Sequence, residues 1–258
     1  MTATLEAPEK LVGALVSGID ILRYMIRARE AVGVSQIARD LDLNTSTCFN
    51  LLRTLVHEGL LRFDAPTKTY SLGLGIVELA KGAIEQGSYA RIVRPHMTTI
   101  AQKHRVTTTL WQRSGPDRVV LVELVDGGGA ARVHMNIGQR LPIYIAALGR
   151  CMAAHTNLPK KELERHFRTL RWEEAPSFKT YVQEVETARR EGFAIDNGNF
   201  VRGVGTVSSL VTDSREDAVM AISAVGFSAQ FSDAGWQALG MDLRRCAREV
   251  SQALKGGA

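Results

Sequence analysis

Apolar residues recur at helical spacing twice between residues 34 and 61. The first repeat covers 35–40. The second fills positions i, i+3, i+4 and i+7, which share one face of a helix: Cys48, Leu51, Leu52 and Leu55. Asn44 or Thr45 can cap this second helix, because a short side-chain oxygen accepts a free backbone N–H. Asp42 stands in the turn, where Asp tolerates a left-handed backbone. The pattern predicts a helix-turn-helix.

The opposite face of the second helix is polar and short-chained, and it holds the candidates for DNA contact: Thr45, Ser46, Thr47, Phe49, Asn50 and Arg53. Hydroxyl and amide groups suit base edges, and a guanidinium such as that of Arg53 suits a phosphate. We therefore expect this helix to enter the major groove. A helical hairpin that only packs would show the same apolar stripe, so the stripe alone leaves both interpretations open.

Two strand-like runs follow between residues 62 and 72, separated by a turn that contains Pro66. A β-hairpin directly after a recognition helix is a wing. Lys68 lies at its tip, from which it can reach phosphate or the minor groove. The wing favours DNA binding over simple helix packing.

The rest of the chain alternates between helical and extended patterns. Further helices are expected at 15–29, 74–86, 92–105, 146–156, from Asn157, 180–191 and 232–254. Strands are expected at 107–113, 119–125, 131–137, 193–196, 206–212 and 218–226. In the first helix, four residues are predicted to face the core: Ile19, Leu22, Met25 and Ile26.

This order predicts an α+β protein in which helices flank an antiparallel sheet. We place a flexible arm at 1–12, a winged helix-turn-helix domain at 13–73, a linker helix at 74–88 and a larger α/β domain at 89–258. The length of 258 residues is sufficient for two such domains.

Composition narrows the choice of class. Hydrophobic residues make up 45% and charged residues 23%, as in globular proteins. No apolar run approaches the ~20 residues that span a bilayer, and residues 1–10 lack a signal-peptide pattern, so we expect a cytoplasmic protein with no membrane partner. The three cysteines are far apart and the six histidines show no ligand spacing, so no disulfide, metal or other cofactor is expected.

The net charge of +5 is unevenly distributed. Residues 1–86 hold 9 Lys/Arg against 10 Asp/Glu, whereas the remaining residues hold 23 against 17. The basic excess therefore lies outside the predicted DNA-binding part, and the helix-turn-helix prediction rests on the residue pattern. A near-neutral N-terminal part keeps open the alternative that the winged helix docks a protein partner.

Three ordered motifs resemble the IclR (isocitrate-lyase regulator) family of bacterial transcription regulators: STCFNLLRTLVHEGLL, TKTYSLGLGIVELA and LPIYIAALGRCMAA. The resemblance implies a homodimer or tetramer that binds a pseudo-palindromic double-stranded operator, a linker helix that helps to pair subunits, and a GAF-like effector-binding domain. Two positions depart from the family. Asp42 stands where Gly is usual, and Asn50 stands where Arg is common, which suggests a different operator.

Matched motif to motif, the resemblance places a small-molecule effector against seven residues: Ala147, Leu148, Asp196, Val204, Thr206, Ser223 and Val225. Strand periodicity independently puts Ser223 and Val225 on one face. Trp111 is a further candidate because its ring can stack on a ligand, although core packing is the more usual role of Trp. As alternatives, Asp196 caps a turn, and Thr206 and Ser223 are ordinary strand residues.

The resemblance also bears on the effector's chemistry. Family members that sense short oxo-acids are more polar at the position of Val225 and often have Cys at that of Thr206. We therefore expect a larger, partly apolar effector, such as an aromatic acid, with a short oxo-acid as the alternative. A small-acid-binding enzyme with an accessory helical domain is the alternative from another class. No catalytic residue is assigned, because the chain lacks a nucleophile elbow, a dinucleotide-binding motif and a paired-carboxylate motif.

Overall fold

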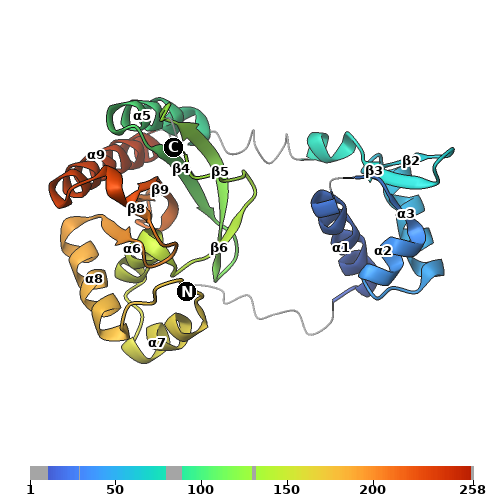
Figure 1. Cartoon of the computed structure of the whole chain (residues 1–258), viewed down its shortest axis with the longest axis horizontal. Helices are drawn as coiled ribbons and strands as arrows, with labels where there is room; N and C mark the ends of the chain where they lie inside the picture. Colours follow the sequence, from blue (N-terminus) through green and yellow to red (C-terminus); the bar gives the residue numbers. More distant parts are fainter. Residues whose placement is uncertain (1–10, 29, 80–88, 130–131, 257–258) are drawn as a thin grey trace. The chain divides into compact units, whose positions relative to one another are not determined.

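The computed structural model describes residues 11–28, 30–79, 89–129 and 132–256. The chain divides into two compact units, Met1–Gly87 and Ser88–Ala258 (Figure 1). Of the predicted linker helix, residues 75–79 are helical and the remainder lies outside the described residues, as does most of the predicted arm. In the described part, no helix is both long and apolar enough to cross a bilayer.

The first unit packs three helices beside a small antiparallel sheet of strand order β1-β3-β2. Its elements are α1 (Gly13–Ala28), β1 (Val32–Gly33), α2 (Val34–Asp40), α3 (Thr45–His57), β2 (Leu61–Asp64) and β3 (Thr69–Leu72). The apolar stripe of α3 enters the core of this unit, where Cys48 and Leu52 are fully buried. The predicted helix-turn-helix and wing are thus confirmed.

The turn between α2 and α3 has the predicted local chemistry. Asp42 takes a left-handed conformation with a φ of 52°. The side chain of Asn44 caps α3 by accepting from the backbone N–H of Ser46 at 3.0 Å. These two short polar residues fix the direction in which α3 leaves α2.

The predicted core face of α1 is wrong in part. Ile21 and Met25 are buried as α1 packs against α3 and β3, but Ile19 is 40% exposed and Ile26 is 61% exposed. The apolar residues of α1 extend around more of the helix than one packing partner can cover. Periodicity alone therefore could not identify the buried side.

The second unit is a six-stranded antiparallel sheet of order β6-β5-β4-β9-β8-β7 with helices on both faces (Figure 1). Its helices are α5 (Tyr89–His104), α6 (Ala146–Thr156), α7 (Lys160–Thr169), α8 (Phe178–Glu191) and α9 (Asp233–Gly256), with a 3-10 turn at Ser228–Gln230. Its strands are β4 (Thr107–Arg113), β5 (Arg118–Asp126), β6 (Arg140–Pro142), β7 (Ala194–Asn197), β8 (Val204–Thr212) and β9 (Ala218–Phe227).

The two faces of the sheet have separate cores. On one face, α5 and α9 pack over a cluster that includes Leu110, Val207 and Ile222. On the other face, α6 and α8 pack over the side chains of alternate residues, among them Trp111 and Ala221. The expected α+β arrangement is confirmed, and β4, β5, β8 and β9 contribute to both layers.

Two local predictions are wrong. Residues 132–137 form no strand, and the place beside β5 is taken by β6, with Val119 opposite Leu141. Asn157 does not open α7. It ends α6 in a left-handed conformation with a φ of 48°, and Pro159 precedes α7. Asn suits both the start and the end of a helix, so its position between two helices was ambiguous in the sequence.

Candidate functional site

The polar face of α3 is open to solvent. All six predicted DNA-contact residues on this helix are exposed: Thr45, Ser46, Thr47, Phe49, Asn50 and Arg53. The Arg53 guanidinium lies 5.9 Å from the centre of the Phe49 ring, which holds the cation beside an aromatic face. A polar helix face next to a wing has the shape and donor set that major-groove docking requires.

The turn of the wing is held by Asp64, whose carboxylate accepts from the backbone N–H of Thr67 at 3.3 Å. Lys68 follows in a left-handed conformation (φ 56°) and is exposed. Its ammonium group can therefore reach beyond the hairpin. Contact of these side chains with DNA stays a prediction.

The register of the second sheet brings most of the effector candidates together. Direct cross-strand neighbours share a face, and here Thr206 lies opposite both Asp196 and Val225, while Ser223 lies opposite Ser208. Val204 and Trp111 follow on the same face by alternation. Ala147 and Leu148 reach this face from α6 and are buried. The six strand candidates thus share one sheet face, and the two candidates of α6 approach it.

Two hydroxyl groups on this face differ in their partners. Ser223 Oγ lies 2.6 Å from Ser208 Oγ, so a serine pair satisfies itself across β8 and β9. The Oγ1 atom of Thr206 is buried and has no hydrogen-bond partner among the described residues. A buried hydroxyl without a partner is costly and is one sign of a group that awaits a ligand.

Both carboxylate oxygens of Asp196 have hydrogen-bond partners. Its Oδ1 accepts from Arg150 Nη1 at 2.9 Å, and its Oδ2 accepts from the backbone N–H of Phe200 at 3.1 Å. Burial raises the pKa of Asp196 even though Arg150 and that N–H favour the charged form. The turn-capping role that the sequence left open is therefore present, and this carboxylate shapes the turn that leads into β8.

Arg150 is a buried charged residue beside these candidates that the sequence analysis did not single out. It is fully buried on α6, donates to Glu184 at 2.8 Å and to Asn199 at 3.0 Å, and lies 5.4 Å from the centre of the Tyr181 ring. The sequence holds one indication of this role: an arginine stands inside the small-residue run ALGRCMAA, and a charge that is buried there needs partners. Arg150 ties α6, α8 and the β7–β8 turn together.

Trp111 and the start of α6 complete the site. The Trp111 indole N–H donates to Thr109 Oγ1 at 3.0 Å, and its ring joins the core that contains Tyr144. Ala146 opens α6 with a φ of 54°, a left-handed conformation that costs a non-glycine residue ~1–2 kcal/mol. Gly149 packs on the Tyr144 backbone, where a Cβ atom would clash. The backbone is thus tightly constrained beside Ala147.

Both units match known family models. Residues 14–65 match the IclR helix-turn-helix domain, and residues 82–252 match the C-terminal domain of the bacterial transcriptional regulator IclR. The chain belongs to the IclR family. The matches cover the helix-turn-helix up to β2 and the whole of the second sheet, so membership extends over both units.

IclR relatives align along most of the chain. The HTH-type transcriptional repressor AllR of Escherichia coli K12 is 26% identical over 244 residues, which are 93% of this chain and 90% of AllR. The IclR regulator structure from Alicyclobacillus acidocaldarius superposes with a TM-score of 0.80 at 23% identity, covering 94% of this chain and 99% of that one. An IclR homologue from Microbacterium hydrocarbonoxydans complexed with 4-hydroxybenzoate gives 0.77 at 21%, covering 93% and 98%.

Membership decides between the classes that the sequence left open. The IclR family consists of transcriptional regulators, so the winged helix is a DNA-binding element and the second unit is the family's effector domain. The protein-docking and enzyme alternatives have no comparable support. The structural relatives, at 21–23% identity, show the fold of this IclR chain and do not identify its ligand.

Proposed function

We propose that this chain is a transcriptional repressor that releases its operator when a partly apolar carboxylic acid binds its second unit. The observation that carries the DNA part is the exposed polar face of α3, presented by a folded winged helix. The curated relative AllR is a repressor, which supports repression as the direction of control.

A homodimer accounts for the apolar surface of the first unit. Six apolar side chains before and along α1 are at least 38% exposed: Leu11, Val12, Leu15, Val16, Ile19 and Ile26. Leu74, Val77 and Leu79 at the start of the linker are exposed as well. Apolar surface of this extent usually marks an interface. A two-fold dimer would read a pseudo-palindromic operator, because the symmetry of the site mirrors that of the protein.

The effector is inferred from the sheet face that α6 covers. Val204 and Val225 provide an apolar wall, and the unpartnered Thr206 Oγ1 provides one hydrogen-bonding group. Leu148 and Ser223 are buried on this face, at 5% and 3% exposure. An aromatic acid therefore requires this layer to open, and the 4-hydroxybenzoate complex of the Microbacterium relative shows that the fold admits such a ligand in that protein.

Operator selection with the full-length chain tests the DNA part. Selection from random double-stranded DNA should enrich a two-fold symmetric sequence. Asn50→Ala should relax the preference at one base pair in each half-site, at a cost of about 1–3 kcal/mol. Arg165→Ala, at an exposed position on α7, is the matched control and should change nothing. Failure to enrich any sequence at physiological salt would contradict the proposal and favour docking of a protein partner.

Effector identity is tested on the selected operator. 4-Hydroxybenzoate should release the protein from DNA, and pyruvate should not. Val225→Ser should weaken the response to the aromatic acid, because a hydroxyl replaces apolar contact area. Release by pyruvate alone would show that the short oxo-acid alternative is correct. Turnover of either acid, with no operator affinity, would favour the enzyme alternative.

A further inference from the structure

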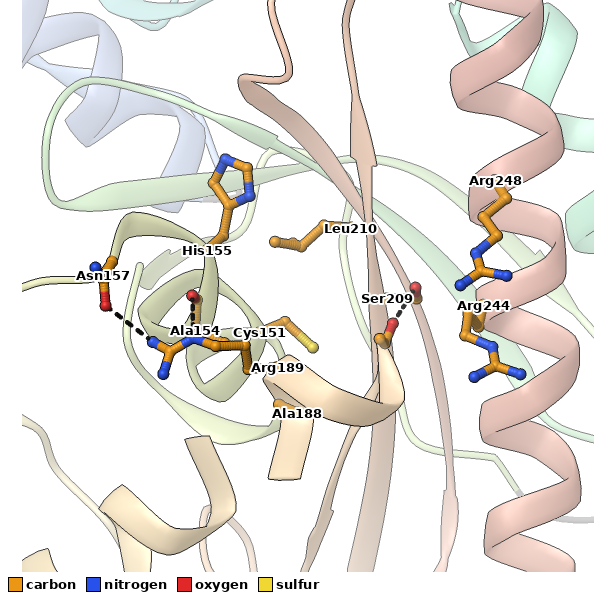
Figure 2. A pocket seen from close by; sticks show the side chains of 11 residues that line it. Cys151, Ala154, His155, Asn157, Ala188, Arg189, Ser209, Leu210, Arg244 and Arg248 are labelled. Carbon is orange, nitrogen blue, oxygen red and sulfur yellow. Dashed lines mark hydrogen bonds between the residues drawn. The ribbon is translucent and has the colours of Figure 1, made fainter. Parts of the chain in front are cut away.

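A basic cleft lies at the edge of the second sheet, away from the effector candidates. β7 pairs with β8 only from Gly205 to Ser208, whereas β8 continues to Thr212. The ends of α6 and α8 and the middle of α9 surround the remaining edge of β8. Together they enclose a cleft of about 630 Å³ (Figure 2), and none of the eight effector candidates lines it. This volume is typical of sites for small molecules.

The charged side chains that line the cleft are all basic. Its eleven lining residues, all within the described part of the chain, include three arginines and one histidine and no Asp or Glu. Its floor is apolar or neutral, with Ala154, Ala188 and Leu210. A cationic rim over a small apolar floor is complementary to a molecule with one anionic group and a short apolar body.

Two of the arginines have structural roles. Arg189 Nε donates to the Ala154 carbonyl at 3.2 Å, and its Nη1 donates to the Glu186 carboxylate at 2.6 Å. Arg244 Nη1 donates to the Glu191 carbonyl at 2.9 Å, at the end of α8. Capping of helix ends explains these positions, but it leaves most of the Arg244 donors free.

Arg248 is not explained by capping. No hydrogen-bond or ion-pair partner is found for its guanidinium in the described part of the structure. It stands one turn from Arg244 on α9, and both side chains border the cleft from this helix (Figure 2). Like charges at this spacing destabilise a helix. An anion bridging the two guanidinium groups would remove that repulsion and form charge-assisted hydrogen bonds.

The cysteine that lines the cleft is not reactive. Cys151 lines it, but its thiol donates to the Ser208 carbonyl at 3.1 Å, and burial raises the pKa of Cys151 to about 12. The thiolate is the reactive form, so this cysteine is inert at neutral pH.

We propose that the cleft reversibly binds a small organic phosphate or carboxylate, with its anionic group held by Arg244 and Arg248.

Calorimetric titration of the full-length chain with phenyl phosphate tests this site. Phenyl phosphate should bind, inorganic phosphate should bind more weakly, and phenol should not bind. Arg248→Gln should weaken phenyl phosphate binding about tenfold or more, because charge-assisted hydrogen bonds are lost. The affinity of Arg248→Lys for phenyl phosphate should lie between those of the wild type and Arg248→Gln, because lysine keeps the positive charge and loses the bidentate guanidinium geometry.

Matched variants show whether binding depends on the cleft itself. Arg245→Gln removes the same charge from the same helix at a position that does not line the cleft, and it should leave binding unchanged. Thr206→Val should also leave it unchanged. No binding by the wild type, or equal weakening by Arg245→Gln, would overturn the proposal. Loss of binding in Thr206→Val would show that phenyl phosphate occupies the effector face instead.

Discussion

At the scale of single residues, Lys68 and Asn50 should affect DNA binding in different ways. Lys68 is exposed at the tip of the wing, whereas Asn50 lies on the face of α3 that we expect to meet base edges. Phosphate contacts position a protein on DNA, and base contacts specify the sequence. The two variants therefore separate affinity from specificity.

Lys68→Ala should weaken binding to every DNA sequence to a similar degree. The loss of one phosphate contact should flatten the plot of log affinity against log salt concentration by about one unit. Fluorescence anisotropy at several salt concentrations, on the operator and on a scrambled sequence, measures both effects. Weakening on the operator alone would show that Lys68 does not contact phosphate.

Asp42, in the turn between α2 and α3, occupies a backbone conformation that suits glycine better. Its left-handed conformation is strained for a residue with a Cβ atom, and glycine removes that strain at a cost in unfolded-chain entropy. Asp42→Gly should therefore stabilise α3 by about 0.5 kcal/mol. Hydrogen exchange of the buried α3 amides measures this, with Asp42→Ala as the control. Faster exchange in the glycine variant would contradict the strain argument.

At the scale of elements, Asp242 joins α9 to α5. Its Oδ2 accepts from Lys103 Nζ at 2.6 Å and lies 2.7 Å from His104 Nε2. Burial acts to raise the pKa of Asp242, but the hydrogen bonds and the charges of Lys103 and His104 together outweigh it, and the pKa is lowered. A carboxylate with a lowered folded-state pKa stabilises the protein above its unfolded pKa, and this stability is lost as the pH falls through the folded pKa.

Asp242→Asn should consequently lower the free energy of unfolding by about 1–2 kcal/mol at pH 7. The difference from wild type should shrink below about pH 4, the usual pKa of an Asp carboxyl in an unfolded chain, as the pH falls toward the lowered folded-state pKa. Urea unfolding between pH 7 and pH 3 measures the difference, and Asp233→Asn, exposed on the same helix, is the control. A difference that stays constant with pH would show that the contact is not ionic.

The elements themselves were largely predictable, and the exceptions share a cause. The stripe of α3 and the alternation of β8 are set by residues within one segment, and both segments were found. Residues 132–137 alternate like a strand, yet the place beside β5 belongs to Arg140–Pro142. Which segment takes an edge position is decided by tertiary pairing, and local periodicity does not contain that information.

The effector face was predicted as a set of residues but not as a surface. The sequence showed that Ser223 and Val225 share a face. Only the register could place Thr206 opposite Asp196 and engage Asp196 with Arg150. The sequence likewise does not reveal the basic cleft. Its residues come from four elements and share no sequence motif.

At the scale of the whole molecule, regulation requires that the effector and the operator favour different states. A ligand shifts an equilibrium only by its difference in affinity for the two states. The effector candidates lie in the second unit, and the DNA-contact candidates lie in the first. Their interaction is therefore a coupling free energy between distinct sites.

Such coupling has to be reciprocal. If a saturating aromatic acid lowers operator affinity by a given factor, saturating operator DNA has to lower the affinity for that acid by the same factor, expected at about 5–150-fold. Anisotropy with and without the acid gives one factor, and calorimetry with and without operator gives the other. DNA of equal length and scrambled sequence is the control. If the operator leaves acid affinity unchanged while the acid displaces the protein from DNA, the acid acts outside the binding equilibrium of the folded protein, for example by aggregating it. Equal factors that level off at saturating ligand would show that acid and operator bind together at distinct sites, because direct competition would keep lowering the affinity without limit.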